Sequence, residues 1–289
     1  MKAQKSAYLY ALGTVLLWST VASAFKISLR FINIVPLLFY ASLMSTAVFF
    51  IYLLFCKKLN LLKGLTTRDY LRSALLGFLN PFLYYLILFK AYSLLPAQQA
   101  QPINFIWPIT LVLLSAPLLH QKIRPRDILA AAISLVGVFI ISSRGDISGF
   151  RFTSSLGVSL ALISTVIWSL FWIYNVKDKQ DEGVRLFLNF AFGSAFTFLS
   201  MLLFAEMKLP GFNGLLGAAY VGLFEMGVTF LLWLRALKLS STTAHVANLI
   251  YLAPFFSLGV ISIAVGETIL LSTVTGLVFI VGGIILQKL

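Results

Sequence analysis

Residues 221–230 read VGLFEMGVTF, an apolar stretch with a single carboxylate, Glu225, at its centre. A carboxylate among apolar side chains loses its hydration, so the surrounding solvent decides what this residue can do. Hydrophobic residues make up 60% of the 289 residues and charged residues 11%, and the mean hydropathy is +0.97. Soluble domains are typically about 45–50% apolar and about 25% charged. The composition therefore predicts an integral membrane protein.

Ten apolar runs are long enough to cross the hydrocarbon layer of roughly 30 Å, which takes about 20 helical residues. They cover residues 6–25, 34–55, 70–92, 96–119, 127–143, 155–175, 184–204, 213–235, 242–264 and 271–287. The connections are short, and several carry glycine or proline at a helix end. We therefore predict an all-α, polytopic membrane protein with ten transmembrane helices and no separate soluble domain.

The opening stretch has a counterpart 145 residues earlier in the chain, because Gly222 and Glu225 align with Gly77 and Asn80. Similar offsets align Lys90 with Arg235 (145), Pro108 with Pro254 and Gly137 with Gly283 (146), residues 38–47 with 186–195 (148), and Trp18-Ser19 with Trp168-Ser169 (150). Helices one to five therefore match helices six to ten in order. Since five is an odd number, the second copy crosses the membrane in the opposite sense.

We predict two inverted five-helix repeats, residues 1–150 and 151–289, related by a pseudo-two-fold axis in the membrane plane. Two similar halves of opposite orientation can exchange conformations, so inward-open and outward-open forms become nearly equivalent. This is the geometry of alternating access, with a site at the repeat interface near the bilayer midplane. Because both repeats lie in one chain, the fold needs no partner, and we expect a monomer.

The basic residues indicate an orientation in the lipid bilayer. If the N-terminus is inside, 16 of the 22 Lys and Arg residues lie on the inner side, which predicts that both termini are cytoplasmic. The same placement accounts for the net charge of +13 without a nucleic-acid partner. Lys2, Lys5 and the small residues 22–24 could also mark a cleaved signal peptide. The length of the run, Trp18 within it and the repeat favour a retained helix.

Several stretches resemble a known family. Trp-Ser occurs in the first helix of each half, and a proline lies inside helices four and nine. The chain also contains AYLYALGTVLLWSTVASAFKISLR at residues 7–30, PINFIWPITLVLLSAPLLHQKI at 102–123 and VGETILLSTVTGLVFIVGGIIL at 265–286. With its two five-helix halves, the whole chain resembles the EamA branch of the drug/metabolite transporter (DMT) superfamily, and the first two stretches are similar to an aromatic amino acid exporter.

The resemblance implies an exporter in the bacterial inner membrane. Its substrates would be amino acids, such as phenylalanine, tyrosine, tryptophan, methionine and threonine, or related metabolites or drugs. It also implies a central cavity lined mainly by helices one to four and six to nine. Coupling stays open between proton antiport and facilitated diffusion, because small multidrug relatives carry their essential acid in helix one, and helix one has no acid here.

Polar residues near the midplane are the first candidates for substrate binding. Glu225 is central in helix eight and Asn80 in helix three, where a charge costs at least about 3 kcal/mol. Glu225 is either a structural acid, kept protonated or hydrogen-bonded, or a proton-coupling group or ligand for the substrate's ammonium. Helical spacing and depth add further polar or aromatic candidates: Tyr84, Gln101, Asn104, Thr229 and Asn248.

Deep aromatic residues are the second group of candidates. Trp18 and Trp168 lie about 12 or 13 residues into their helices, too deep for an interfacial belt. With Trp172, Tyr84 and Trp107, we predict that they form an adaptable apolar cavity for large side chains. The alternative is that Trp18 and Trp168 only hold the two halves apart.

Two further repeat-related pairs have a mechanical or electrostatic interpretation. Pro108 and Pro254 are predicted to kink helices four and nine, so we expect gating to flex there. Lys90 and Arg235 lie at the ends of helices three and eight, where long side chains extend to the lipid–water interface. Recognition of a substrate carboxylate is the alternative interpretation of these two cations.

Other chemistry has little support in the sequence. Cys56 is the only cysteine, which excludes an internal disulfide, and His120 and His245 have no acid at ligand spacing, so we expect no metal or other cofactor. No Walker motif supports ATP-driven transport, and no paired nucleophile and base supports an enzyme. We therefore predict a secondary transporter that is not an enzyme. The alternatives are a lipid scramblase, a membrane-embedded enzyme, or a receptor or scaffold.

Overall fold

The computed structural model describes residues 2–120, 124–146, 153–176, 178, 180–204, 209–239 and 248–288. These residues form helices joined by turns, and no strand occurs among them. A helix satisfies its backbone N–H and C=O groups within one segment, as a lipid environment without water requires. The predicted all-α fold class is confirmed.

The transmembrane segments also follow the prediction. Eight helical segments of the described chain are long and apolar enough to span a membrane: Gln4–Ser28, Ile34–Phe55, Thr67–Leu94, Ala97–Leu119, Pro125–Ser142, Ser155–Asn175, Glu182–Phe204 and Phe212–Trp233. Two shorter apolar helices, Ala253–Val265 and Leu271–Leu286, complete the set of ten. The predicted run 242–264 begins among residues outside the described part of the chain. The protein is a multi-pass membrane protein.

Several of these spans are divided into shorter elements. In chain order, the elements are α1 (Lys2–Ser28), α2 (Ile34–Phe55), η1 (Leu59–Gly64), α3 (Thr67–Gly77), η2 (Phe78–Leu83), α4 (Tyr84–Leu94), α5 (Ala97–Asn104), α6 (Trp107–Leu119), α7 (Pro125–Ser142), α8 (Ser155–Val176), α9 (Glu182–Phe204), α10 (Phe212–Tyr220), η3 (Val221–Glu225), α11 (Val228–Leu239), η4 (Asn248–Leu252), α13 (Ala253–Val265) and α14 (Leu271–Lys288). The divisions fall in spans three, four, eight and nine, which carry most of the predicted site residues.

Packing divides the chain into two compact units. Unit 1 contains Met1–Leu86 and Lys179–Val260, and unit 2 contains Ile87–Asp178 and Ile261–Leu289. Each unit therefore takes segments from both halves of the sequence. This division describes contacts, whereas the boundary after residue 150 separates the repeats and stays a prediction.

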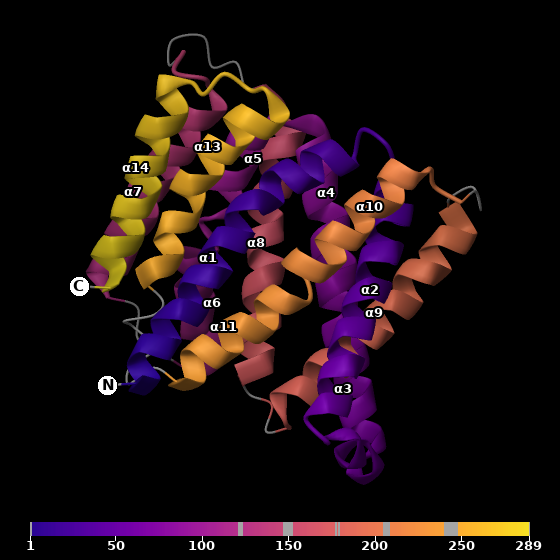
Figure 1. Cartoon of the computed structure of the whole chain (residues 1–289). Helices are drawn as coiled ribbons and strands as arrows, with labels where there is room; N and C mark the ends of the chain where they lie inside the picture. The colour runs from indigo at the N-terminus through magenta and orange to yellow at the C-terminus, as the bar shows by residue number, and fades with distance from the viewer. Residues whose placement is uncertain are drawn as a thin grey trace. The chain divides into compact units, whose positions relative to one another are not determined.

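In unit 1, α2 and α9 run antiparallel and side by side (Figure 1). Three of the side-chain pairs that join them are Ser42 with Thr197 (3.1 Å), Thr46 with Ser194 (3.0 Å) and the rings of Phe49 and Phe190 (5.0 Å). Thr46 and Ser194 are counterparts at the 148-residue offset. The same offset maps Ser42 onto Phe190 and Phe49 onto Thr197, so it converts each of the other two pairs into the other. A two-fold axis repeats each contact in this way. The α2–α9 crossing therefore lies on a local pseudo-two-fold axis.

Two glycines let neighbouring helices approach this pair closely. A Cβ atom on Gly77 would lie 2.3 Å from the carbonyl oxygen of Asn189 in α9, and one on Gly222 would lie 2.5 Å from that of Ala41 in α2. Gly77 and Gly222 are counterparts at the 145-residue offset, and Ala41 and Asn189 at 148. Gly77 and Gly222 therefore lie at equivalent helix crossings, each three residues before its polar residue, Asn80 or Glu225.

In unit 2, α7 and α14 pack side by side along a seam of small residues (Figure 1). A Cβ atom on Gly137 would lie 2.5 Å from the carbonyl oxygen of Gly276, and one on Gly283 would lie 2.7 Å from that of Ala130. The 146-residue offset maps Gly137 onto Gly283 and Ala130 onto Gly276, so it converts each of these contacts into the other. Close backbone approach through small residues is a common way for helices to associate in lipid.

Glu267, in the Gly-Glu sequence before α14, caps another helix of unit 2. Its carboxylate accepts hydrogen bonds from the backbone N–H groups of Ala97 (2.8 Å) and Gln98 (3.1 Å), the first residues of α5. The Gln98 side chain donates to the carbonyl oxygen of Thr268 and accepts from the hydroxyl of Thr273. The first N–H groups of a helix have no partner within it, so this carboxylate stabilises the start of α5.

Candidate substrate site

Glu225 ends the π-helical turn η3, between α10 and α11. Its side chain is buried, with 7% exposed. The Tyr85 hydroxyl donates to Oε1 over 3.0 Å, and the Trp18 indole N–H also reaches the carboxylate. Oε2 has no hydrogen-bond partner among the described residues. A buried polar atom left unpaired costs about 1–3 kcal/mol and more when charged, so a proton or a cationic ligand group would stabilise Oε2.

Asn80 occupies the equivalent place in the first half of the chain. It lies in the π-helical turn η2, where its φ of −150° and ψ of 122° depart from the helix. The following residue, Pro81, has no N–H to continue the helical bonding. The Asn80 side chain is fully buried, and neither Nδ2 nor Oδ1 has a partner within the described ranges. π-Helical turns recur at functional sites, and here two repeat-related turns each carry an open polar atom.

Two other predicted residues of unit 1 lie close to these turns but have different contacts. Tyr84 is buried and packs edge-on against Tyr85, with ring centroids 4.7 Å apart. Thr229 is fully buried, and its hydroxyl donates to the backbone carbonyl oxygen of Phe224. Thr229 thus satisfies a carbonyl at the break in its own helix, while Tyr84 supports the tyrosine that binds Glu225.

Unit 2 gathers three predicted tryptophans into one cluster. Trp168 of α8 is buried, and its ring centroid lies 6.3 Å from that of Trp107 in α6 and 5.7 Å from that of Trp172. Phe171 adds a fourth ring at 6.2 Å from Trp168. Both tryptophan pairs meet edge to face, a favoured arrangement for aromatic rings. The rings pack against one another, and their role in a cavity stays a prediction.

Two predicted amide side chains of α5 differ in their contacts. Asn104 donates from Nδ2 to the Ser164 hydroxyl over 2.9 Å and so links the end of α5 to α8. Gln101 lies one turn earlier, and its Oε1 is buried without a hydrogen-bond partner in the part of the chain that the structure describes. Of the two, Gln101 is therefore the residue whose side-chain oxygen could still accept a hydrogen bond.

The two repeat-related prolines stand at equivalent helix starts. Pro108 follows Trp107 at the start of α6, and Pro254 follows Ala253 at the start of α13. In each case the carbonyl before the proline accepts a bond from the serine of a Trp-Ser pair: Ser19 to Ala253 (3.2 Å) and Ser169 to Trp107 (3.2 Å). Spans four and nine are thus divided next to these prolines, and gating there stays a prediction.

Sequence reasoning missed the role of the two serines and of Tyr85. The serines were visible in the repeated Trp-Ser pairs, and Pro81 was the signal that span three is broken. Asn248 begins η4, but its side chain, like all of His245, lies outside the described part of the chain. Within the described ranges, no group of three or more His, Cys, Asp or Glu side chains is placed to hold a metal ion.

Comparisons with known proteins place this fold among transporters. An uncharacterized transporter of Clostridium kluyveri is 28% identical over 179 residues, 59% of this chain and 56% of that protein. The aromatic amino acid exporter YddG of Ancylobacter novellus is 29% identical over 156 residues, 53% of each chain. The chain therefore matches little more than half the length of these two relatives. The uncharacterized transporter YvbV of Bacillus subtilis is 28% identical over 224 residues, 75% of this chain and 70% of that protein.

A solved crystal structure that is 24% identical in sequence covers 98% of both chains with a TM-score of 0.69, which supports the fold alone. The sequence pattern of the EamA-like transporter family matches residues 5–143 and again residues 155–287. These matches cover most of the 289 residues. The chain, an inverted five-plus-five repeat of transmembrane helices, belongs to the EamA-like transporter family.

Proposed function

We propose that the protein is a secondary transporter that exports amino acids, aromatic ones included, by alternating access. One observation carries the proposal: the two π-helical turns of Glu225 and Asn80 are repeat counterparts, and each holds a buried polar atom that has no hydrogen-bond partner among the described residues. Transporters with inverted repeats bind their substrates at discontinuous helices near the midplane. The similarity to YddG supports amino acids as the substrate class.

The chemistry of the two turns suits the backbone of an amino acid. Glu225 Oε2 is an acceptor suited to the substrate's ammonium, and Asn80 offers both a donor and an acceptor. Tyr85 holds the other carboxylate oxygen in place over 3.0 Å. Trp107, Trp168 and Trp172 form an aromatic cluster within unit 2, and their contact with a substrate side chain stays a prediction. These assignments follow the predicted substrate-binding set.

We further propose the bacterial inner membrane as the location, with both termini in the cytoplasm. The support is the placement of 16 of the 22 Lys and Arg residues on that side. Cys56 follows the inner end of α2 in this orientation and is the only cysteine. A membrane-impermeant maleimide should therefore label Cys56 in inverted vesicles and not in intact spheroplasts, and the reverse result would invert the topology.

Transport is tested with purified protein in liposomes. Labelled phenylalanine is supplied to wild type and Glu225→Gln, with and without an imposed pH gradient, and threonine, methionine and lysine are added as competitors. We expect saturable uptake by wild type that protein-free liposomes lack.

The pH gradient separates two roles of Glu225. Acceleration by the gradient that is lost in Glu225→Gln would assign proton coupling to this residue. Uptake that does not change with the gradient but is slower in Glu225→Gln would indicate facilitated diffusion, with Glu225 as the ligand of the substrate's ammonium. Absence of uptake under either condition would refute amino-acid transport and favour another small metabolite, as the relatives named only as transporters allow.

A further inference from the structure

A strongly basic segment, residues 57–72, connects the second and third spans within unit 1. It contains five Lys or Arg residues and one acid, Asp69, which gives a net charge of +4 (five minus one). Its counterpart at the 148-residue offset, residues 205–220, contains one Lys and one Glu and has no net charge. The repeated fold therefore does not require this charge, and none of the five cations belongs to the predicted substrate-binding set.

The basic segment lies at the surface of the membrane. The second span ends at Phe55, and the third begins at Thr67. Residues 73–89, which are 17 residues without a charge, make about 26 Å of helix and so nearly cross the hydrocarbon layer of roughly 30 Å. The first turns of α3, which precede these residues, therefore lie at the level of the lipid headgroups, as η1 does.

One face of η1 is attached to the rest of unit 1. Leu59, Leu62 and Leu65 are partly buried and pack against a buried cluster from α2 and α9. A 3-10 helix has three residues per turn, so leucine at every third position forms a single stripe. Other residues of the same stretch, Leu61 and Lys63, are exposed. The leucine stripe thus fixes which face of the segment points away from the protein.

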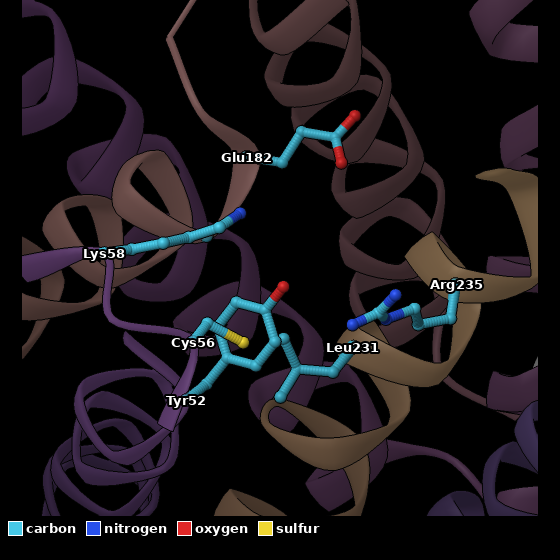
Figure 2. Close-up of a pocket in the computed structure, with 7 residues that line it drawn as sticks. Tyr52, Cys56, Lys58, Glu182, Leu231 and Arg235 are labelled. Carbon is cyan, nitrogen blue, oxygen red and sulfur yellow. The ribbon is translucent and has the colours of Figure 1, made fainter. Parts of the chain in front are cut away.

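One of the five cations is compensated and points toward the protein. Lys58 Nζ lies 2.6 Å from an Asp181 carboxylate oxygen, and both side chains are about a quarter exposed, at 27% and 25%. Figure 2 shows the Lys58 side chain directed into a pocket of about 270 Å³ that Glu182 and Arg235 also line. Lys58 is therefore not part of the outer face of the segment.

Asp69, the acid of the segment, is engaged at the start of α3. Its carboxylate accepts hydrogen bonds from the backbone N–H (2.8 Å) and the hydroxyl (2.7 Å) of Thr66, which caps this helix. The charge of Arg72, one turn later, acts on the same carboxylate. The cations that remain in the segment are Lys57, Lys63 and Arg68.

These three cations are exposed and form no ion pair within the described ranges. Two large apolar side chains of the same segment, Leu61 and Leu71, are also exposed, at 48% and 67%. Exposed cations together with exposed leucine are typical of a segment that lies in the plane of the lipid–water interface. The depth of the segment favours lipid over a soluble acidic protein as its partner, because headgroups already surround it.

We propose that residues 57–72 form a binding surface for anionic phospholipid, with Lys57, Lys63 and Arg68 at the headgroup phosphate and the two leucines toward the acyl chains. Phosphatidylglycerol carries a negative charge, whereas phosphatidylcholine has no net charge, and Lys or Arg near an anionic membrane surface is attracted to it. The inference goes beyond the proposed function. It concerns a different surface from the substrate site and holds whichever substrate is transported.

The test is the binding of single lipid molecules to the purified protein in a neutral detergent, measured by native mass spectrometry. The probes are phosphatidylglycerol and phosphatidylcholine with the same acyl chains. We expect the first phosphatidylglycerol to bind at least about tenfold more tightly than the first phosphatidylcholine, because each cation contributes about fivefold. Equal dissociation constants for the two lipids would overturn the proposal.

A combined variant, Lys57→Gln/Lys63→Gln/Arg68→Gln, removes the cations of the outer face. It should lose the preference for phosphatidylglycerol, and each single substitution should weaken phosphatidylglycerol binding about fivefold while leaving phosphatidylcholine binding unchanged. A combined variant that keeps the preference would overturn the proposal. A wild-type melting temperature in the same detergent shows that a variant is folded, and the single variants decide the test where the combined variant melts lower.

A charge-matched control and a soluble competitor localise the effect. Lys5→Gln/Lys90→Gln/Arg144→Gln removes three exposed cations from other parts of the chain and lowers the net charge by the same amount. It should keep the preference for phosphatidylglycerol, and an equal loss in both combined variants would assign the effect to overall charge and overturn the proposal. Glycerol 3-phosphate, which has a phosphate without acyl chains, should not displace the lipid at equal concentration. Displacement would show a site for soluble phosphate and would also overturn the proposal.

Discussion

Replacing Gly283 by Ala is expected to destabilise the α7–α14 pair, whereas the same change at the neighbouring Gly282 should stabilise α14. A Cβ atom on Gly283 would lie 2.7 Å from the Ala130 carbonyl oxygen and 2.3 Å from the Ser134 hydroxyl, while one on Gly282 would meet nothing within 4 Å. The two glycines thus share a helix and a sequence context but face different surroundings. Their comparison isolates the packing of the seam.

The magnitude follows from these distances. Glycine in a helix costs roughly 0.5–1 kcal/mol relative to alanine, so both variants gain this amount and the gain cancels in their difference. Ordinary contact begins near 3.4 Å, so the Ala130 backbone would have to retreat by about 0.7 Å, the difference between 3.4 and 2.7 Å. Overpacking of this kind costs about 1–3 kcal/mol. Gly283→Ala should therefore be less stable than Gly282→Ala by about 1–3 kcal/mol.

The measurement is the apparent melting temperature of both variants and wild type in one detergent, followed by tryptophan fluorescence. At roughly 2–4 °C per kcal/mol for a chain of this order of size, Gly283→Ala should melt at least about 2 °C below Gly282→Ala. Equal melting temperatures would refute close packing of α14 on α7 at Gly283. Cysteine variants cross-linked between the two helices provide an independent check that the seam is formed.

Four further substitutions test other contacts. Ser19→Ala and Ser169→Ala should each lower the free energy of unfolding by about 1 kcal/mol, because each leaves the carbonyl before a proline without its side-chain donor; wild-type melting of both variants would count against these bonds. Glu267→Gln removes the charge at the N-terminus of α5 and should cost about 1 kcal/mol, whereas unchanged melting would show that this charge does not stabilise α5. The Lys58–Asp181 pair should contribute at most about 1 kcal/mol at neutral pH. Because the pKa of Asp181 is lowered in the folded protein, its contribution is present above the unfolded value near 3.9 and is lost as pH falls through the folded one. The melting difference between wild type and Asp181→Asn should therefore shrink on acidification below about pH 4, and growth of that difference would contradict this linkage.

The helices and the repeat could be predicted from the sequence because both depend on the order of apolar and small residues along the chain. Neither requires knowledge of side-chain contacts. Hydropathy located the ten spans, and the offsets linked Gly77 with Gly222 before the structure gave them equivalent crossings. Gly137 and Gly283 were found in the same way. Small residues at a crossing leave a direct trace in the sequence, because a larger side chain would separate the helices.

The contacts around Glu225 could not be predicted by helical spacing. The prediction placed Tyr84 on the face of Asn80 and Thr229 on the face of Glu225 by counting four residues along a regular helix. Each span contains a π-helical turn at that place, and a wider turn changes which residues share a face. Tyr85 therefore binds Glu225, and Thr229 bonds to its own backbone.

The pocket between Lys58, Glu182 and Arg235 could not be predicted from the sequence either. Lys58 follows α2, Glu182 begins α9 and Arg235 lies in α11, so the three are far apart in the chain and no spacing rule links them. Arg235 was interpreted mainly as an interfacial cation through its pairing with Lys90. The structure places it, exposed, on the lining of a pocket that also contains Glu182.

The central claim is that the helix breaks at Glu225 and Asn80 hold the substrate's backbone. The most direct measurement is the half-saturating concentration of phenylalanine for transport by wild type, Glu225→Gln and Tyr85→Phe in liposomes at constant pH. Glu225→Gln removes the proposed ammonium ligand, and Tyr85→Phe removes only a neutral donor to the other oxygen. The account predicts a rise of at least about tenfold for Glu225→Gln and a clearly smaller rise for Tyr85→Phe. A wild-type half-saturating concentration for Glu225→Gln would contradict it.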